Sequence, residues 1–240
     1  MIGVDYDEKS KRLVAILKGF PCSWGRCIFC NLSKESTTDL EELLKTDLHI
    51  IEEIARYNAT CEVRRLSIFN GGSFFELPLY VVQQLSNVTK GRYVDIESLP
   101  HFVNEDSVKC TLSLLQPSTL EIRFGFESSN ESIRRSLGKC ITESEVARIS
   151  ELRKTVRDSM GGRIRFVVYV LFGMEGISEE SVIESVTSFK QLFDGVVAIR
   201  YRRYTPEMPN TKPISRRLMT FLSENCLDVD LTEGRVWEIE

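Results

Sequence analysis

The sequence lacks long hydrophobic runs: no apolar stretch reaches the roughly 18 residues that a membrane-spanning helix needs. Its first residues, MIGVDYDEKSKRLVAILKG, do not place a basic segment before an apolar one, so we expect no secretory signal peptide. Excess charge is also missing, because 31 basic and 35 acidic residues give a formal net charge of −4. These absences argue against a membrane protein and against a polycation that binds nucleic acid through overall charge. We expect a cytoplasmic protein.

Histidine is scarce, and cysteine gathers in one place. The chain has two histidines and seven cysteines, and Cys22, Cys27 and Cys30 fall within nine residues of the stretch GFPCSWGRCIFCNL (19–32). In a reducing compartment this spacing favours metal binding or catalysis over disulfides. The other four cysteines are expected to be small buried apolar residues; they are Cys61, Cys110, Cys140 and Cys226.

Short apolar runs alternate with longer amphipathic segments, without internal repeats or low-complexity tracts. The pattern predicts strands over 12–19, 64–72, 93–100, 119–130, 163–174 and 195–206. It predicts helices over 40–58, 77–88, 104–115, 142–160, 178–193 and 215–225. This alternation is typical of parallel β/α units, and about six of them are too few for a complete eight-fold barrel. We therefore predict an α/β fold, a partial (β/α)6 barrel with the cysteine loop after its first strand. It should form a single domain over 1–240, with a core at about 12–205 and an extension over 206–240.

In parallel α/β sheets, functional residues lie at the carboxyl ends of the strands, which is where the cysteine loop begins. Thiolates are soft ligands that suit zinc or iron–sulfur clusters. A closed zinc site needs a fourth ligand, and His101, in a predicted strand–helix loop, could supply it. Alternatively, the three thiolates hold three irons of a 4Fe–4S cube and leave the fourth iron open to a ligand. The residues alone leave both possibilities open.

The cysteine triplet, its place after the first predicted strand and Phe29 between the last two cysteines resemble the radical SAM superfamily. The first gap is four residues, where the family usually has three. The resemblance implies a 4Fe–4S cluster on Cys22, Cys27 and Cys30, together with S-adenosylmethionine and an electron donor of the flavodoxin or ferredoxin type. It also implies that residues at the later strand ends bind S-adenosylmethionine. Those residues would be Phe29, Asn70, Gly71, Gly72, Ser73, Glu97, Ser98, Glu127 and Leu171.

Three stretches, 68–78, 97–108 and 123–142, look most like one branch of that superfamily. This branch contains the Elongator catalytic subunit and the radical SAM subunit of archaeal archaeosine synthesis. The resemblance implies action on a modified base in tRNA, with a partner enzyme that attaches lysine. One basic, aromatic-bearing stretch, 199–217, is a candidate for substrate contacts. Its candidate residues are Arg200, Arg202 and Tyr204.

Two other functions stay open from the sequence. The protein could be a radical SAM enzyme that acts on a small metabolite or a peptide, since arginines also bind small carboxylates. It could instead be a non-enzymatic iron–sulfur or zinc-binding protein, which would have a fully ligated metal and would not bind S-adenosylmethionine.

Overall fold

The structure is a computed structural model that describes residues 2–231. Its strands follow the order of the chain through one eight-stranded sheet, β1 to β8. The chain divides into two compact units. Among the described residues, the first consists of 2–25, 31–122 and 154–165, and the second of 26–30, 123–153 and 166–231.

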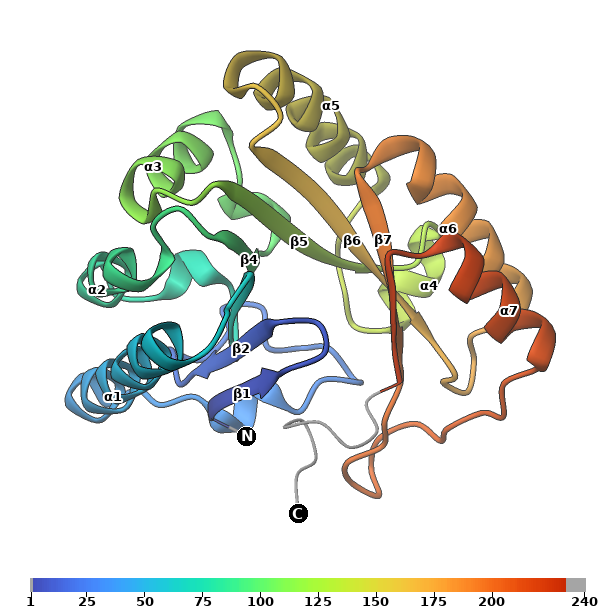
Figure 1. Cartoon of the computed structure of the whole chain (residues 1–240). Helices are drawn as coiled ribbons and strands as arrows, with labels where there is room; N and C mark the ends of the chain where they lie inside the picture. The colour runs from blue at the N-terminus through green and yellow to red at the C-terminus, as the bar shows by residue number, and fades with distance from the viewer. Residues whose placement is uncertain (1, 232–240) are drawn as a thin grey trace. The chain divides into compact units, whose positions relative to one another are not determined.

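The first unit begins with a β-hairpin. Strand β1 (Gly3–Asp7) pairs antiparallel with β2 (Arg12–Leu17), and Asp7 accepts hydrogen bonds from Lys9 N and Ser10 Oγ in the turn between them. The parallel strands β3 (Arg65–Asn70) and β4 (Tyr93–Glu97) follow. Three helices pack side by side against these strands (Figure 1); they are α1 (Leu40–Thr60), α2 (Leu79–Thr89) and α3 (Glu105–Leu115).

The second unit contains the later strands and their helices. Three elements have residues in both units: β5 (Thr119–Glu127), α5 (Glu143–Met160) and β6 (Ile164–Phe172). The remaining elements are α4 (Glu131–Ser136), α6 (Glu179–Leu192), β7 (Gly195–Arg200), α7 (Arg216–Asn225) and β8 (Asp228–Asp230). Strand β7 pairs in parallel with both β6 and β8.

The register of β2 against β3 places the start of the cysteine loop. Leu17 at the end of β2 is paired with Asn70 at the end of β3. Because both strands end at the same level, the loop after β2 begins beside the residues that follow Asn70. Gly71 and Gly72 come next, and they end the predicted strand 64–72 two residues early.

Strand β5 has two contrasting buried faces. Leu120, Ile122, Phe124 and Phe126 are fully buried on one face, and Phe126 contacts the rings of Phe189 and Phe193. The other face carries Glu121, Arg123 and Glu127, whose side chains are also buried. Side chains alternate between the two faces of a strand, so this sequence separates apolar and charged groups completely.

The α/β class, the order of the strands and the parallel pairing of β2 with β3, β3 with β4 and β6 with β7 agree with the prediction from the sequence. The cysteine loop follows the second strand of the chain, because the short strand β1 comes before the first predicted one. The elements β1, α4 and β8 were not predicted. In residues 2–231, no helix combines the length and the apolar character that crossing a bilayer requires.

The prediction for the last long strand was wrong at its end. Strand β7 stops at Arg200, whereas the pattern predicted a strand over 195–206. After Tyr201 the chain leaves the sheet because its polar groups are bound locally. The Tyr201 hydroxyl donates to Pro209 O, and the Arg203 guanidinium donates to Asn210 Oδ1 and to the carbonyls of Thr205 and Pro206.

Candidate functional site

The cysteine loop is shared between the two units. Cys22 lies in the first unit, whereas Cys27 and Cys30 lie in the second. All three are half-buried thiols, and a turn closed by Cys30 N donating to Cys27 O (3.2 Å) joins the last two. Within residues 2–231, no three Cys, His, Asp or Glu side chains are already gathered as a metal site. The role of the three cysteines therefore stays a prediction.

Two carboxylates fix the arm of the loop that carries Cys22. Asp47, a fully buried residue of α1, accepts a hydrogen bond from Lys18 N (2.7 Å) where the loop begins. Glu76 accepts a hydrogen bond from Ser23 N (2.8 Å), directly after the cysteine. Both side chains therefore bind backbone N–H groups of the loop that strand pairing does not satisfy.

The glycines after β3 allow close packing of Cys22 and of Leu32, which follows the last cysteine. A Cβ on Gly72 would lie 3.1 Å from Cys22 Cα, and a Cβ on Gly71 would lie 2.8 Å from Leu32 O. Gly19 leaves β2 in the left-handed region at φ +62°, against the side chain of Asn70. Substitution at these glycines would push the loop away from the strand end, so the sequence requires a residue without a side chain there.

The polar residues predicted at the ends of β3 and β4 lie together in the first unit. Asn70, Ser73 and Ser98 are buried. Asn70 Nδ2 donates to Ser73 O (3.3 Å), and the hydroxyls of Ser73 and Ser98 are 3.1 Å apart. Glu97 is half-buried at the end of β4. The structure thus brings the predicted residues after β3 close to Ser98 and to the backbone of Cys22.

In the second unit, the segment Leu137–Lys139 packs against the arm of the loop that carries Cys27 and Cys30. Leu137 O accepts a hydrogen bond from Ile28 N (3.1 Å). Gly138, at φ +78°, lies so close to the Arg26 carbonyl that a Cβ would overlap the oxygen. Lys139 places its ammonium 5.4 Å from the centre of the Phe29 ring. The contacts hold the backbone of the loop in place from both sides of Cys27.

Lys139 is a buried cation beside the two thiols. Its Nζ donates to Gly125 O (2.6 Å) and to Glu127 Oε1 (2.9 Å). Burial lowers the pKa of Lys139, but the charge of Glu127, the neighbouring Cys27 and Cys30 and the hydrogen bond to Glu127 outweigh it and raise the pKa above the usual lysine value. Lys139 therefore carries a positive charge next to the two thiols at neutral pH.

Glu127 lies at the carboxyl end of β5, as predicted. It is buried and ion-paired with Lys139, and its backbone has φ +66°, which is rare for a residue other than glycine.

Leu171 is buried near the end of β6, where packing in the core explains its position as well as a contact with a ligand would. His101 is exposed after β4, with its ring 4.2 Å from that of Phe102.

The basic stretch after β7 is partly committed to the fold. Arg203 binds three groups within the same stretch, as described above. Arg202 lies over the ring of Tyr204 at 5.7 Å. Burial raises the pKa of Tyr204, and its proximity to Cys30 adds to this rise, whereas Arg202 opposes it. Tyr204 therefore lies near the cysteine loop, and Arg200 ends the strand before it.

Sequence reasoning missed Asp47, Glu76, Lys139 and Arg134. Glu76 had a signal, because Ser73-x-x-Glu76 has the form of a capping box. The structure confirms that box, with Ser73 N donating to Glu76 Oε2 at 2.7 Å.

Arg134 is fully buried and donates to the carbonyls of Ser128 and Ser129, both at 2.8 Å. It thereby ties the chain after Glu127 to α4.

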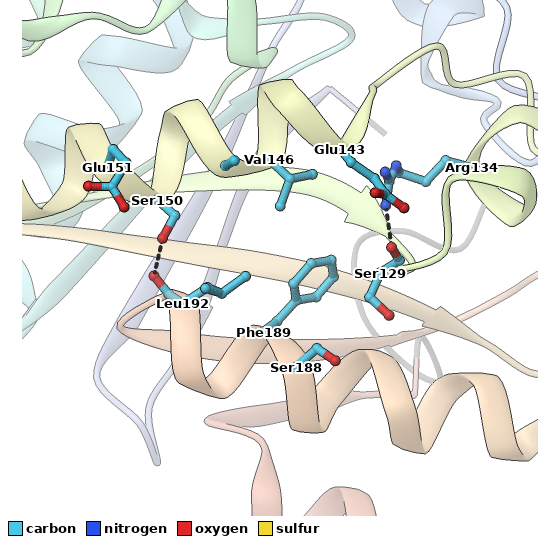
Figure 2. Close-up of a pocket in the computed structure, with 10 residues that line it drawn as sticks. Ser129, Arg134, Glu143, Val146, Ser150, Glu151, Ser188, Phe189 and Leu192 are labelled. Carbon is cyan, nitrogen blue, oxygen red and sulfur yellow. Dashed lines mark hydrogen bonds between the residues drawn. The ribbon is translucent and has the colours of Figure 1, made fainter.

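A pocket of about 400 Å³ lies between α5 and α6 (Figure 2). Arg134 and Glu143 lie at one end, and Ser150 and Glu151 at the other. Phe189, which lines the pocket, contacts Phe126 on the apolar face of β5. Glu127 lies on the opposite face of that strand, so this pocket is separate from the residues around the cysteine loop.

Replacing Asp47 by Asn should make stability less dependent on pH. Burial raises the pKa of Asp47 from 3.8 to about 6. Because the folded pKa is higher than the unfolded one, the proton on Asp47 stabilises the folded state, and this stabilisation is complete below about pH 4. As pH rises through 6 the proton dissociates, and the free energy of unfolding falls by about 3 kcal/mol. Urea unfolding of both proteins from pH 4 to 8 measures this difference.

For Asp47→Asn, we expect the free energy of unfolding to exceed that of the wild type at pH 7 and to fall less between pH 4 and 7. Glu53→Gln is the control, because Glu53 lies on α1 in an exposed pair with Arg56. An identical pH profile for Asp47→Asn and the wild type would contradict the raised pKa.

No protein-family model matches the chain. It is 26% identical over 189 residues, or 74% of its length, to archaeosine synthase subunit beta of Methanosarcina acetivorans. It is 28% identical over 192 residues, again 74% of its length, to an uncharacterised protein of Methanocaldococcus jannaschii. These matches cover 54% and 51% of the two proteins, so the chain spans about half the length of the curated relatives it matches.

Solved structures share the fold. Queuine lyase from Clostridium spiroforme, bound to SAM and queuine, has a TM-score of 0.68 at 20% identity over 92% of this chain and 87% of that one. SuiB of Streptococcus suis bound to S-adenosylmethionine has a TM-score of 0.60 at 15% identity, over 90% and 49% of the two chains. TsrM of Kitasatospora setae, a radical S-adenosylmethionine methyltransferase with cobalamin and a [4Fe-4S] cluster bound, has a TM-score of 0.51 at 16% identity, over 82% and 35%. Together these similarities confirm the α/β fold class and the resemblance to radical SAM enzymes.

Proposed function

We propose that the chain is an iron–sulfur enzyme that binds a 4Fe–4S cluster through the thiolates of Cys22, Cys27 and Cys30. When bound and reduced, this cluster supplies the electron that cleaves the C–S bond of S-adenosylmethionine and yields a 5′-deoxyadenosyl radical. The observation that carries the proposal is the packing of the cysteine loop. Its backbone is pressed against Gly72 on one arm and against Gly138 on the other, where any side chain would displace it.

The residues around the loop suit such a cluster. Three thiolates are soft ligands for iron and leave one iron open. The buried ammonium of Lys139 offsets the negative charge of Cys27 and Cys30. The thiols must be reduced and an external donor must supply the electron. Both needs fit the cytoplasm and a donor of the flavodoxin or ferredoxin type.

S-adenosylmethionine would bind along the strand ends on both arms of the loop. On the Cys22 arm, the backbone of Gly71 and Gly72 allows close approach, while Asn70, Ser73 and Ser98 offer an amide and two hydroxyls. Glu97 offers a carboxylate at the next strand end. On the other arm the ligands would be Glu127 for the ribose, with Phe29 and Leu171 against the adenine.

For the substrate we favour a modified base in tRNA, with a partner enzyme that attaches lysine. The support is the relative from Methanosarcina acetivorans, whose name refers to archaeosine synthesis. Arg200, Arg202 and Tyr204 would contact a phosphate or a base near Cys30. Arg203 is excluded from this role by its bonds within the stretch.

A second candidate is action on a small molecule such as a free modified base. The observation that favours it is the similarity to queuine lyase, which extends over nearly all of both chains. The curated relatives, in contrast, are about twice as long as the part that matches. A free base needs no extended phosphate-binding surface, and the net charge of −4 suits it.

Electron paramagnetic resonance of the anaerobically reconstituted and reduced protein tests the cluster and its open iron. We expect a reduced 4Fe–4S signal that changes when S-adenosylmethionine is added, because an open iron accepts a new ligand. A protein that retains zinc and gives no cluster signal would overturn the proposal. So would a cluster signal that does not respond to S-adenosylmethionine.

The two substrate classes differ in their dependence on salt. Binding to tRNA should weaken steeply between 50 and 200 mM salt, by about a thousandfold for six or more phosphate contacts, because counterions are released. Binding to queuine should change little over the same range. Equilibrium binding of labelled tRNA and of queuine to the reconstituted protein therefore separates them. Tight queuine binding without tRNA binding would favour the second candidate.

A further inference from the structure

Glu76 lies where the strand end after β3 meets the cysteine loop. Its two carboxylate oxygens bind different segments: Oε2 accepts a hydrogen bond from Ser73 N (2.7 Å), and Oε1 accepts one from Ser23 N (2.8 Å). The first bond caps a short 3₁₀ helix, Phe74–Glu76, and is local. The second crosses 53 residues of sequence and reaches the residue after Cys22.

We propose that Glu76 is a positioning residue for Cys22, and that its charge lowers the reduction potential of the cluster. The inference rests on the proposed function, because it concerns the cluster that Cys22 would bind. Bonds between a carboxylate and a backbone N–H are among the stronger hydrogen bonds, so one bond can orient the peptide that follows Cys22.

Gly72 faces both Glu76 and Cys22. A Cβ on Gly72 would lie 2.7 Å from Glu76 Oε2 and 3.1 Å from Cys22 Cα. A side chain at position 72 would therefore overlap the carboxylate and crowd the cysteine. A change in the carboxylate therefore alters the group that binds the peptide after Cys22.

The same bond has an electrostatic consequence. Ser23 N–H donates to an oxygen of Glu76, so it does not donate to a cysteine sulfur. Hydrogen bonds to sulfur and positive charge raise the potential of an iron–sulfur cluster, whereas a nearby negative charge lowers it. Lys139 provides the opposite charge on the arm with Cys27 and Cys30. On the Cys22 arm, Glu76 is the carboxylate that binds the residue directly after the cysteine.

Two variants separate the effect of the negative charge at position 76 from the effect of the side-chain length. Glu76→Gln removes the charge and places an amide NH₂ where one of the two acceptors was. Glu76→Asp keeps the charge but is one methylene too short to bind both N–H groups. The matched control is Glu53→Gln, which removes a carboxylate from a surface pair on α1. All four proteins are reconstituted anaerobically, and thermal melting of each before reconstitution gives its folded fraction.

We expect Glu76→Gln to retain a cluster whose reduction potential is more positive than that of the wild type. We expect Glu76→Asp to keep a potential near the wild-type value but to hold iron about tenfold less tightly against a chelator, as is usual when a residue that orients a ligand is lost. Potential is measured by redox titration followed by paramagnetic resonance, and iron by colorimetric assay.

The inference is overturned if both variants match the wild type in potential and iron retention. It is also overturned if iron is lost only in proportion to the unfolded fraction. Failure of the proposed function looks different, because the wild-type protein itself would then bind no cluster, which overturns both statements. If the reduction potential changes in Glu76→Gln but not in Glu53→Gln, the change is due to the carboxylate at position 76.

Discussion

Cys27→Ser should prevent the protein from retaining an iron–sulfur cluster. A serine hydroxyl is a hard and weakly acidic ligand, whereas cluster irons prefer thiolate sulfur. Cys27 lies between the two groups that fix its arm of the loop: Arg26, whose carbonyl packs on Gly138, and Ile28, whose N–H donates to Leu137 O. The backbone should therefore keep its position while the ligand is lost. Iron and sulfide analysis after anaerobic reconstitution measures the loss.

The matched control for this prediction is Cys140→Ser. Cys140 is an exposed thiol directly after Lys139 and lies outside the loop. It should keep the full iron content and the full resonance signal. If Cys27→Ser also kept both, Cys27 would not be a ligand, and the assignment of the metal site to this loop would be wrong.

Gly138→Ala should destabilise the fold and lower cluster uptake together. A left-handed backbone costs an alanine about 1–2 kcal/mol. The new Cβ would also overlap the Arg26 carbonyl oxygen, and overpacking of this kind costs about 1–3 kcal/mol. We expect a loss of about 3 kcal/mol in the free energy of unfolding from the two effects combined. Urea unfolding and iron content after reconstitution are the two measurements.

Gly176→Ala separates backbone strain from overlap. Gly176 lies in the same unit at φ +88°, but a Cβ there would meet nothing within 4 Å. This variant should lose only the part due to the left-handed backbone, about 1 kcal/mol, and should take up iron normally. Equal losses of stability and of iron in the two variants would show that contact with Arg26 does not matter.

The long elements were predictable because their signals are local. Each predicted helix corresponds to one in the structure, since apolar residues at helical spacing need only one face against a sheet. The ends of strands were less predictable. Strand β3 ends at Asn70 because two glycines follow, and β7 ends at Arg200 because the next residues bind one another. Such endings depend on contacts that periodicity does not record.

The short elements could not be predicted for a different reason. Strand β1 is only five residues, GVDYD, and β8 is only three, DVD. Neither contains an apolar run, and each becomes a strand through hydrogen bonds to a neighbour that already exists. Pairing of this kind is non-local, so intrinsic propensity carries little information about it.

The candidate site was predictable in its ligands and strand ends but not in the groups that support them. The cysteines, Asn70 and Ser98 stand at strand ends, which a sequence pattern can locate. Asp47 also had a signal in the sequence, because it is a charged residue on the helix face that carries the buried residues Leu43, Ile50 and Ile54 of α1. Lys139 had no such signal. Its role depends on a bend of the chain at Gly138 that brings it back to Glu127.

The alternation along β5 has a consequence for how the strand finds its partners. If β5 slipped by one residue, Arg123 would turn toward the phenylalanines around Phe126, and Phe126 would turn toward the charged groups. Burying an unpaired guanidinium among aromatic rings is far more costly than losing a few contacts. Misaligned pairings of this strand are thus much less stable than the native one, so its charged residues help to select the correct register of the sheet during folding.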